Sequence, residues 1–289
     1  MTSPEVVCLG ELVWDCYGGR SYLGGAPFNV AVQLARHHCG TALLTAVGLD
    51  DLGRRALDFL REEGIPGARE HPRLPTGTVS VDLDASGQPR FTIHGDGAWT
   101  DLEGAETLDP EVLAEVPAVL VFGGLAMHAP GNRHLLEQQL ERWCGDPGGP
   151  PIRLCDLNLR PGWADPAVAR WCLEHCHYLK VNREEAGFLA AMEGCADLGA
   201  VLERRPLRGI CITLGPDGLV WKQPGRPDLG VPAWKHAPPV VDTLGAGDAV
   251  TAALAAGLAA GEAPARFLER SQHWAAWTCA VPGALPPRA

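Results

Sequence analysis

The sequence of 289 residues contains no run of 18 or more strongly apolar residues, so it offers no candidate for a membrane-spanning helix. Basic residues are also scarce: 24 Lys and Arg stand against 35 Asp and Glu, a net charge of −11. That balance argues against nucleic acid or an anionic membrane as the main partner, and it leaves room for a local phosphate site. The first residues lack the basic segment of a signal peptide, so we expect a cytoplasmic protein.

Two familiar anion-binding motifs are missing as well. No Gly-x-x-x-x-Gly-Lys-[Ser/Thr] segment occurs, which excludes a P-loop protein. The stretch Gly245–Val250 lacks the third glycine of a dinucleotide fingerprint and lies far from the first strand–helix unit. A nicotinamide-dependent oxidoreductase is therefore a disfavoured alternative.

The composition is that of a folded globular protein, with 46% hydrophobic and 20% charged residues. A chain of this length buries roughly 75% of its unfolded surface, so it needs no disulfide or metal to stabilise it. Ten cysteines at irregular spacing indicate reduced thiols. Cys172, His175 and Cys176 could bind a structural zinc, but no second pair stands at finger-like spacing, and buried thiols are the favoured interpretation.

Short apolar runs alternate with helical patterns along most of the chain. This alternation predicts an α/β fold in which helices cover both faces of a mainly parallel sheet. The strands are expected at 6–10, 42–47, 119–122, 152–155, 177–181, 210–213 and 219–221, and helices at 29–36, 53–63, 134–143 and 166–175.

Two segments follow a different pattern. Residues 78–83 and 90–94 alternate apolar and polar side chains on either side of a polar loop, which predicts an antiparallel hairpin with one exposed face. Such a hairpin beside the ends of parallel strands is a candidate lid. Its packed face is expected to carry Val79, Val81, Leu83, Phe91 and Ile93.

The strongest chemical signal is the segment 240–250, which ends a strand-like run and opens an Ala-rich helix. Gly245, Ala246 and Gly247 are small enough for their N–H groups to approach an anion at a helix N-terminus, where free donors and the helix dipole favour negative charge. Asp248 would repel a static phosphate, but it suits a base that takes a proton from an attacking hydroxyl. A Gly-rich turn capped by Asp248 is the alternative.

These residues resemble the PfkB, or ribokinase-like, family of carbohydrate kinases. The family's Asp-Thr-x-Gly-Ala-Gly-Asp signature matches Asp242–Asp248, and its N-terminal signature looks present in Gly24–Ala31 and Val47–Gly53. Two signatures in the right order, about 200 residues apart, are far more specific than either one. The stretches Gly10–Asp15 and Gly25–Asn29 look most like the bacterial fructokinase branch.

The resemblance covers 6–284 and implies a single domain over residues 1–289. That domain would be a ribokinase-like three-layer α/β/α sandwich with a small β lid, formed mainly from about 74–100 together with the 15–24 segment. Lids of this family sometimes pair between subunits, so a homodimer through the lid is one expectation. Trp99 would either shield the sugar or belong to the core.

The resemblance also implies roles for the matched residues. Asp248 would be the catalytic base, and the backbone of Gly245, Ala246 and Gly247 would bind the transferring phosphoryl group. The implied sugar contacts are Asp15, Gly24, Gly25, Asn29, Asp248 and Arg160, the last from a segment that resembles the family's Asp-x-Asn-x-Arg. Without the resemblance, Asp15 would be a loop residue, Asn29 a helix cap and Arg160 half of a surface ion pair.

Further motifs imply a nucleotide and its metal. Asn182 and Glu185 resemble the family's Asn-x-x-Glu, in which the pair orients Mg²⁺ and its waters, with Glu185 acting through water; a helix start explains the pair equally well. Thr213, Gly215 and Gly218, with Gly247, would lie close to ATP, and a plain hairpin turn is the alternative for the first three.

Two more features of the family bear on the cofactors. The segment 271–284 resembles the part that closes over the adenine, although Gln272 and His273 stand about where relatives often have Asn. Some relatives bind a monovalent cation through backbone oxygens near the segment that corresponds to Asp242–Leu244.

We therefore expect an ATP- and Mg²⁺-dependent sugar kinase whose small-molecule substrate is fructose. The alternatives in the same fold are kinases for another sugar, for a sugar acid such as 2-keto-3-deoxygluconate, or for a nucleoside. A catalytically silent, sugar-binding regulatory protein is the alternative from another class, and the intact Gly245–Asp248 segment counts against it.

Overall fold

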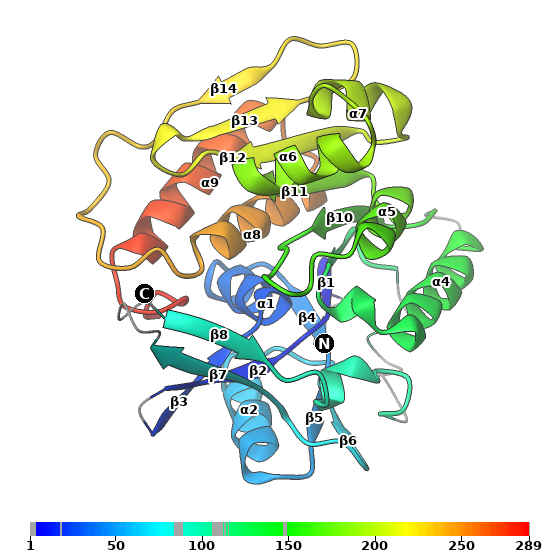
Figure 1. The fold of residues 1–289 in the computed structure, drawn as a ribbon, viewed down its shortest axis with the longest axis vertical. Coiled ribbons are helices and arrows are strands. Elements are labelled where there is room, and N and C mark those ends of the chain that lie inside the picture. Colours follow the sequence, from blue (N-terminus) through cyan, green and yellow to red (C-terminus); the bar gives the residue numbers. More distant parts are fainter. Residues whose placement is uncertain are drawn as a thin grey trace.

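The centre of the molecule is an eight-stranded sheet in the order β14-β13-β12-β11-β10-β9-β1-β4 (Figure 1). The computed structural model describes residues 4–17, 19–83, 89–105, 112, 114, 116–146 and 149–288. The strands are β1 (Val6–Leu9), β4 (Thr41–Leu44), β9 (Val119–Gly123), β10 (Ile152–Asp156), β11 (Tyr178–Asn182), β12 (Gly209–Thr213), β13 (Leu219–Lys222) and β14 (Leu229–Val231). The strands from β12 to β4 are parallel, and β13 and β14 are antiparallel additions at one edge.

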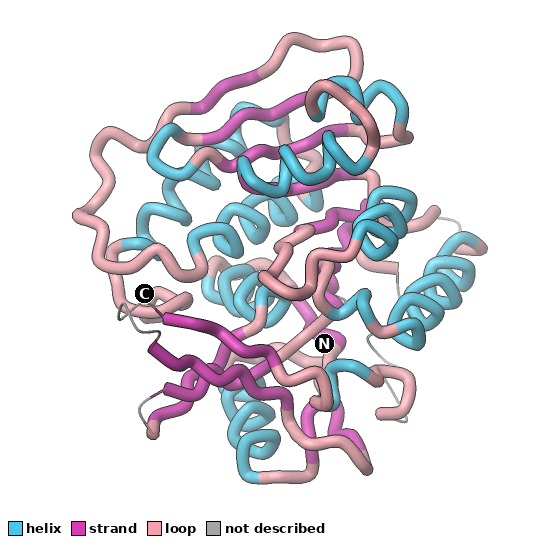
Figure 2. The backbone as a smooth tube through the Cα atoms, viewed as in Figure 1, coloured by secondary structure: helices cyan, strands magenta, loops and turns pink. Residues whose placement is uncertain are grey.

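Helices cover both faces of this sheet (Figure 2). One face packs against α4 (Pro130–Cys144), α5 (Pro166–His175), α6 (Arg183–Met192) and α7 (Leu198–Arg204). The other packs against α1 (Ala26–Arg36), α2 (Asp51–Glu62), α8 (Ala246–Ala259) and α9 (Pro264–Cys279). The predicted three-layer α/β/α architecture is confirmed.

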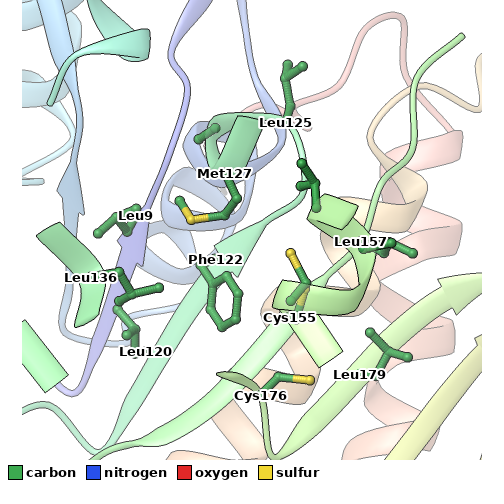
Figure 3. Packing of buried hydrophobic residues seen from close by; sticks show 14 of the residues in the cluster. Leu9, Leu120, Phe122, Leu125, Met127, Leu136, Cys155, Leu157, Cys176 and Leu179 are labelled. Atoms are coloured by element: carbon green, nitrogen blue, oxygen red, sulfur yellow. The ribbon is translucent and has the colours of Figure 1, made fainter. Parts of the chain in front are cut away.

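The parallel strands are buried on both faces, so neighbouring residues of one strand enter different cores. In β1, Val7 and Leu9 belong to the core under α4–α7, whereas Val6 and Cys8 belong to the core under α1, α8 and α9. Figure 3 shows the first of these cores, in which the fully buried Phe122 is surrounded by aliphatic and sulfur-containing side chains. Burial on both faces explains why these strands are continuous apolar runs in the sequence.

The strand expected at 42–47 is in fact two strands. The first is β4 in the main sheet, whereas β5 (Ala46–Gly48) pairs in parallel with β6 (Arg69–His71) in a separate two-stranded sheet. Thr45 between them is buried. Because both strands are buried, the apolar run is unbroken, and its sequence does not show where the chain leaves the main sheet and pairs with β6.

Two helices begin three or more residues earlier than expected. The first residue of α1 is Ala26, three positions ahead of the prediction, and α4 begins at Pro130, four positions ahead. Each helix has a proline in its first turn, where the fixed φ and the missing N–H suit a helix start. Asn29 therefore lies inside α1, and the N-cap is Gly25 at a φ of 109°, so the helix-cap alternative for Asn29 is wrong.

A four-stranded sheet, here called the lid sheet, follows directly on β1. Its order is β3 (Arg20–Gly24), β2 (Val13–Tyr17), β7 (Gly77–Leu83) and β8 (Pro89–Ile93). The strands β7 and β8 form the predicted antiparallel hairpin, and β2 pairs with β7 in parallel. Val79 is buried and Ile93 is partly buried against the core, whereas the side chains of Val81, Leu83 and Phe91 lie outside the described part. Movement of the lid sheet stays a prediction.

Trp99 belongs to the core. It lies in the 3₁₀ turn Ala98–Thr100 and is fully buried. The lid sheet is built against it, because a Cβ at Gly77 would come within 2.4 Å of the Trp99 ring. Of the two roles considered for Trp99, the structure supports the packing role.

The cysteines of the 172–177 segment are packing residues. Cys172 and Cys176 are 0% and 2% exposed. Among the described residues, no cluster of three or more His, Cys, Asp or Glu side chains is placed to hold a metal ion, so the zinc alternative has no support. The helices that the structure describes include none with the length and apolar character needed to cross a membrane.

Candidate active site

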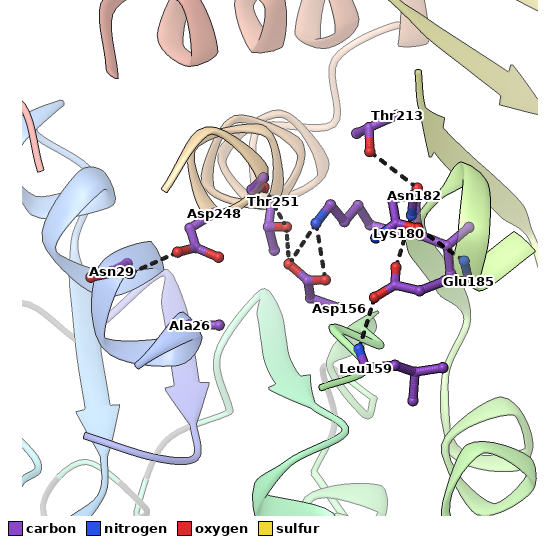
Figure 4. A network of polar contacts seen from close by, with 12 residues as sticks. Ala26, Asn29, Asp156, Leu159, Lys180, Asn182, Glu185, Thr213, Asp248 and Thr251 are labelled. Atoms are coloured by element: carbon purple, nitrogen blue, oxygen red, sulfur yellow. Dashed lines mark hydrogen bonds and ion pairs between the residues drawn. The ribbon is translucent and has the colours of Figure 1, made fainter. Parts of the chain in front are cut away.

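The two matched signatures meet in one hydrogen bond. Asp248 stands in the first turn of α8, and Asn29 stands inside α1, 219 residues away in the sequence. Asn29 donates from Nδ2 to Asp248 Oδ2 across 2.7 Å, and both residues are buried. Figure 4 shows the two side chains turned toward each other from their helices. The N-cap of α8 receives no side-chain hydrogen bond, so the Asp248 carboxylate does not cap the turn, and the alternative of an Asp-capped turn is wrong.

The turn before Asp248 is held in an unusual backbone conformation. Gly245 is the N-cap of α8 in the left-handed region, at a φ of 77°. A Cβ there would lie 2.4 Å from the carbonyl oxygen of Ala284, so only glycine fits. Asp242 joins this turn to the C-terminal segment that contains Gly283 and Ala284. Its carboxylate accepts hydrogen bonds from the N–H groups of Leu244 at 3.0 Å and Gly283 at 2.9 Å.

The first N–H groups of a helix have no intrahelical acceptor. At the start of α8 these groups belong to Ala246, Gly247 and Asp248, and the Ala246 N–H donates to the Thr243 carbonyl at 3.3 Å. The N–H groups that follow, together with the helix dipole, form a site suited to an anion. Asp248 lies at the same helix end.

The protonation of Asp248 is tuned by its surroundings. Its pKa is raised to about 6, chiefly by burial and then by the neighbouring Asp156 carboxylate. The Lys180 ammonium and the hydrogen bond from Asn29 oppose that rise. A carboxylate with a pKa near 6 is ionised at neutral pH and is a stronger base than an exposed aspartate.

Three of the residues expected at the sugar, Asp15, Gly24 and Gly25, lie together. Asp15 is on β2, and a Cβ at Gly24 on the neighbouring β3 would come within 2.7 Å of Asp15 Oδ2. Gly25 is equally constrained, since a Cβ there would lie 2.4 Å from the carbonyl oxygen of Glu11. Burial raises the pKa of Asp15, and the charge of Arg160 lowers it. The structure thus brings Asp15, Gly24 and Gly25 together at the start of α1, the helix that carries Asn29.

Arg160 is exposed on the loop after β10. No ion pair of Arg160 is found within the part of the chain that the structure describes, so the surface ion-pair alternative has no support there. Burial raises the pKa of Glu11, Asp15 and Asp248, and the charge of Arg160 opposes that rise at all three. Arg160 thus lies near the acids of the predicted sugar site.

One acid of this site was not predicted. Glu11, two residues after the end of β1, is 3% exposed, and its Oε1 accepts a hydrogen bond from the Ala26 N–H at 3.3 Å. Its pKa is raised to about 7, chiefly by burial, and the charge of Asp248 adds to the rise. The available signal was its position at the carboxyl end of a buried parallel strand, where open α/β sheets bind ligands.

A second missed group is Lys180 on β11. Its Nζ donates to both carboxylate oxygens of Asp156, at 3.1 and 3.2 Å, and Thr251 of α8 donates to Asp156 Oδ2 at 2.6 Å. All three residues are buried. A lysine within a predicted strand gives no sign of a polar role, so this cluster (Figure 4) emerges only from the packing of α8 on the sheet.

Asn182 and Glu185 form the start of α6. Asn182 Oδ1 accepts from the Glu185 N–H at 2.9 Å, and Glu185 Oε2 accepts from the Asn182 N–H at 2.8 Å, which is a capping box. Glu185 Oε1 also accepts from the Leu159 N–H at 2.7 Å. The helix-start interpretation is therefore correct. With each oxygen already accepting one N–H, Glu185 fits a metal ion held through water better than one bound directly.

The predicted nucleotide turn lies at the same edge of the sheet. Thr213 at the end of β12 pairs with Asn182, so both side chains lie at the carboxyl edge. Gly215 and Gly218 have φ values of 61° and 96° in the turn that joins β12 to the antiparallel β13. The turn is thus a hairpin, which was the alternative to a nucleotide-binding turn in the sequence analysis. Its contact with a nucleotide stays a prediction.

An apolar surface borders the loop before α8. Val240, Val241 and Leu244 are exposed, and Trp277 of α9 is 56% exposed. The Val241 N–H donates to the Cys279 carbonyl at 2.7 Å, which places the loop against the end of α9. Large exposed apolar groups gathered in one place mark binding surfaces. Nearby, Gln272 is buried and His273 packs on Trp234.

Comparison with known proteins defines the class first: this is a phosphotransferase that uses an alcohol group of a sugar as acceptor. The chain belongs to the pfkB family of carbohydrate kinases, whose model matches residues 4–288. The sequence resemblance to that family is confirmed.

The relatives point to one branch of the family. The fructokinase of Salmonella typhimurium is 31% identical over 253 residues, 83% of this chain and 78% of that protein. The fructokinase of Klebsiella pneumoniae is 32% identical over 257 residues, 82% of this chain and 77% of that protein. The crystal structure of the Xylella fastidiosa fructokinase with bound ATP superposes with a TM-score of 0.82 at 20% identity, covering 97% and 94% of the two chains. The expected ribokinase-like fold and fructokinase-like branch are confirmed.

Proposed function

We propose that this chain transfers the γ-phosphoryl group of ATP to a hydroxyl of fructose. The observation that carries the proposal is the Asn29–Asp248 hydrogen bond, which joins the sugar-side signature to the phosphate-side signature at one buried carboxylate. The fructokinase relatives support fructose as the sugar. The exposed apolar surface of Val240, Val241 and Trp277 suits the flat adenine ring of ATP.

The proposed reaction is an in-line displacement. Asp248 takes the proton of the sugar hydroxyl as its oxygen attacks the γ-phosphorus, and the bond from that phosphorus to the bridging oxygen of ADP breaks. The N–H groups at the start of α8 hold the phosphoryl oxygens. Asp15, Asn29 and Arg160, with Gly24 and Gly25 leaving room for them, orient the sugar, and closure of the lid sheet excludes water.

Mg²⁺ would be held on the nucleotide side, with Glu185 and Asn182 positioning its waters, and when bound it would neutralise charge on the phosphates. Thr213, Gly215 and Gly218 are proposed to border the nucleotide. A monovalent cation near the backbone of Asp242–Leu244 and a homodimer through the lid sheet stay predictions.

The proposal is tested by an ADP-release assay over fructose, ribose, 2-keto-3-deoxygluconate and adenosine. We expect the highest kcat/KM with fructose. A higher kcat/KM with another acceptor would reassign the substrate within the family. Binding of a sugar with no release of ADP would instead support the silent regulatory protein.

The pH dependence of the reaction should report Asp248. The base must be ionised, so kcat/KM should fall as the pH drops through about 6, where the carboxylate takes up a proton. Asn29→Ala removes a hydrogen bond that lowers the pKa of Asp248, so the midpoint of this fall should move to higher pH. The matched control is Gln33→Ala, one turn further along α1, because Gln33 bonds Thr278 and not Asp248. Unchanged midpoints in both variants would contradict the assignment.

A further inference from the structure

The Asp156–Lys180–Thr251 cluster lies directly against the turn Gly245–Gly247, here called the anion-binding turn because the proposed reaction places the phosphoryl group there. A Cβ built on Gly247 would come within 2.9 Å of Lys180 Nζ and 3.8 Å of its Cε. The ammonium therefore occupies the space where a side chain at position 247 would lie. This contact explains why residue 247 is glycine, although its backbone does not adopt a positive φ.

The same cluster ties the sheet to the first turn of α8. Asp156 at the end of β10 accepts from Lys180 and from Thr251, and Thr251 Oγ1 also lies 3.1 Å from the carbonyl oxygen of Gly247. Lys180 and Thr251 come from the two elements that flank Asp156 in space, β11 and α8. The ammonium is thus held at one place relative to the N–H groups that bind the anion.

Burying an ammonium and a carboxylate costs free energy, and an apolar pair of similar volume is often no less stable. The pair therefore needs a reason beyond stability. An ammonium has three N–H donors, and within the described residues the hydrogen bonds of the Lys180 ammonium go to Asp156 alone. A buried positive charge beside a phosphoryl-binding turn acts strongly, because little water screens it.

We propose that Lys180 is a positioning residue of the phosphoryl-transfer site, whose fixed charge behind Gly247 stabilises the phosphoryl group during transfer. Asp156 and Thr251 hold that charge in place. The inference rests on the proposed function, since it requires that the phosphoryl group bind at the start of α8. It predicts a loss of turnover rather than of substrate binding.

The first test is Lys180→Met in the full chain, a neutral side chain of similar length. We expect kcat to fall by a factor on the order of 10²–10³, with the KM values for ATP and sugar nearly unchanged. The matched control is Lys222→Met at the end of β13, which removes another lysine that forms an ion pair with an aspartate, Asp228. Turnover of that control should equal the wild type.

The double variant Lys180→Met with Asp156→Asn separates charge from stability. Removing Lys180 alone leaves Asp156 as a buried charge with no cation beside it, whereas the double variant removes both charges of the ion pair and should melt near the wild type. If the pair serves stability only, kcat returns in the double variant, and the inference is overturned. If the charge acts on the phosphoryl group, kcat stays low although the protein is stable.

If both Lys180 variants are insoluble, Thr251→Val tests the inference instead. It keeps both charges and removes the hydroxyl that holds them against α8, so kcat should fall about 10- to 100-fold with KM unchanged. An unchanged kcat overturns the inference. Failure of the proposed function looks different: Asp248→Asn would then also retain full turnover, whereas failure of the Lys180 inference leaves the Asp248 effect intact.

Discussion

Asp248→Asn should lower kcat by a factor on the order of 10²–10⁴ while the fold and ATP binding persist. The amide has nearly the same shape as the carboxylate, but it cannot take a proton from the attacking hydroxyl. Asn29 can still donate its hydrogen bond to the new amide oxygen. Removing a buried charge close to Asp156 should not destabilise the protein, because that neighbour raises the pKa of Asp248.

Three measurements check this expectation. Steady-state kinetics report kcat, calorimetry reports the Kd for ATP, and thermal unfolding reports stability. The control is Asp58→Asn, an exposed acid of α2 whose partner is Arg61 on the same helix. Turnover close to the wild type in the Asp248 variant would remove this residue from the base role and, with it, the proposed mechanism.

Gly245→Ala should lower kcat nearly as much as Asp248→Asn, because it changes the backbone conformation of the turn before α8. The left-handed conformation costs a non-glycine residue about 1–2 kcal/mol, and the new Cβ would lie 2.4 Å from the backbone oxygen of Ala284. Backbone atoms cannot rotate away as a side chain can, so the turn and its N–H groups must shift. A shift of this kind should lower kcat by a factor on the order of 10²–10³.

The other end of α8 provides a matched control for this substitution. Gly261 follows the helix with a φ of 63°, but nothing lies within 4 Å of a Cβ built there. Gly261→Ala should therefore cost only the conformational penalty, about 1–2 kcal/mol of unfolding free energy, with normal turnover. Equal losses of turnover in the two variants would show that stability, and not the geometry of the anion-binding turn, limits the reaction.

Features that depend on a short segment of the chain could be predicted from the sequence. The continuous apolar runs predicted β1, β9 and β12 because strands buried on both faces need apolar residues throughout. The alternation in 78–83 and 90–94 predicted the β7–β8 hairpin, and among its described side chains Val79 and Ile93 pack toward the core, whereas Thr92 is exposed. Gly245–Asp248 indicated a turn into a helix because small residues and a helix start are both properties of a short segment.

Specific contacts between distant segments could not be predicted from such local patterns. The resemblance placed Asn29 and Asp248 at the same sugar, but no local pattern near Asn29 predicts their hydrogen bond, and none near Lys180 predicts that it lies against Gly247. Glu11 belongs to the fructokinase-like stretch Gly10–Asp15 but had no assigned role, and only its hydrogen bond from the start of α1 brings it into the site. The break at Thr45 was missed because a buried run has the same composition whichever strand it pairs with.

The sequence by itself determined the kinds of element, the two family signatures and the residue types available for chemistry. The resemblance implied that Asn29 and Asp248 share a site, but only the tertiary structure decided their hydrogen bond and brought Glu11 and Lys180 to that site, because strand order and helix packing set the neighbours of each carboxyl-end residue. Those neighbours also set the charge: burial and Asp156 raise the pKa of Asp248, while Lys180 and Asn29 limit the rise. Such energies depend on distance in space, which no local pattern of residues records.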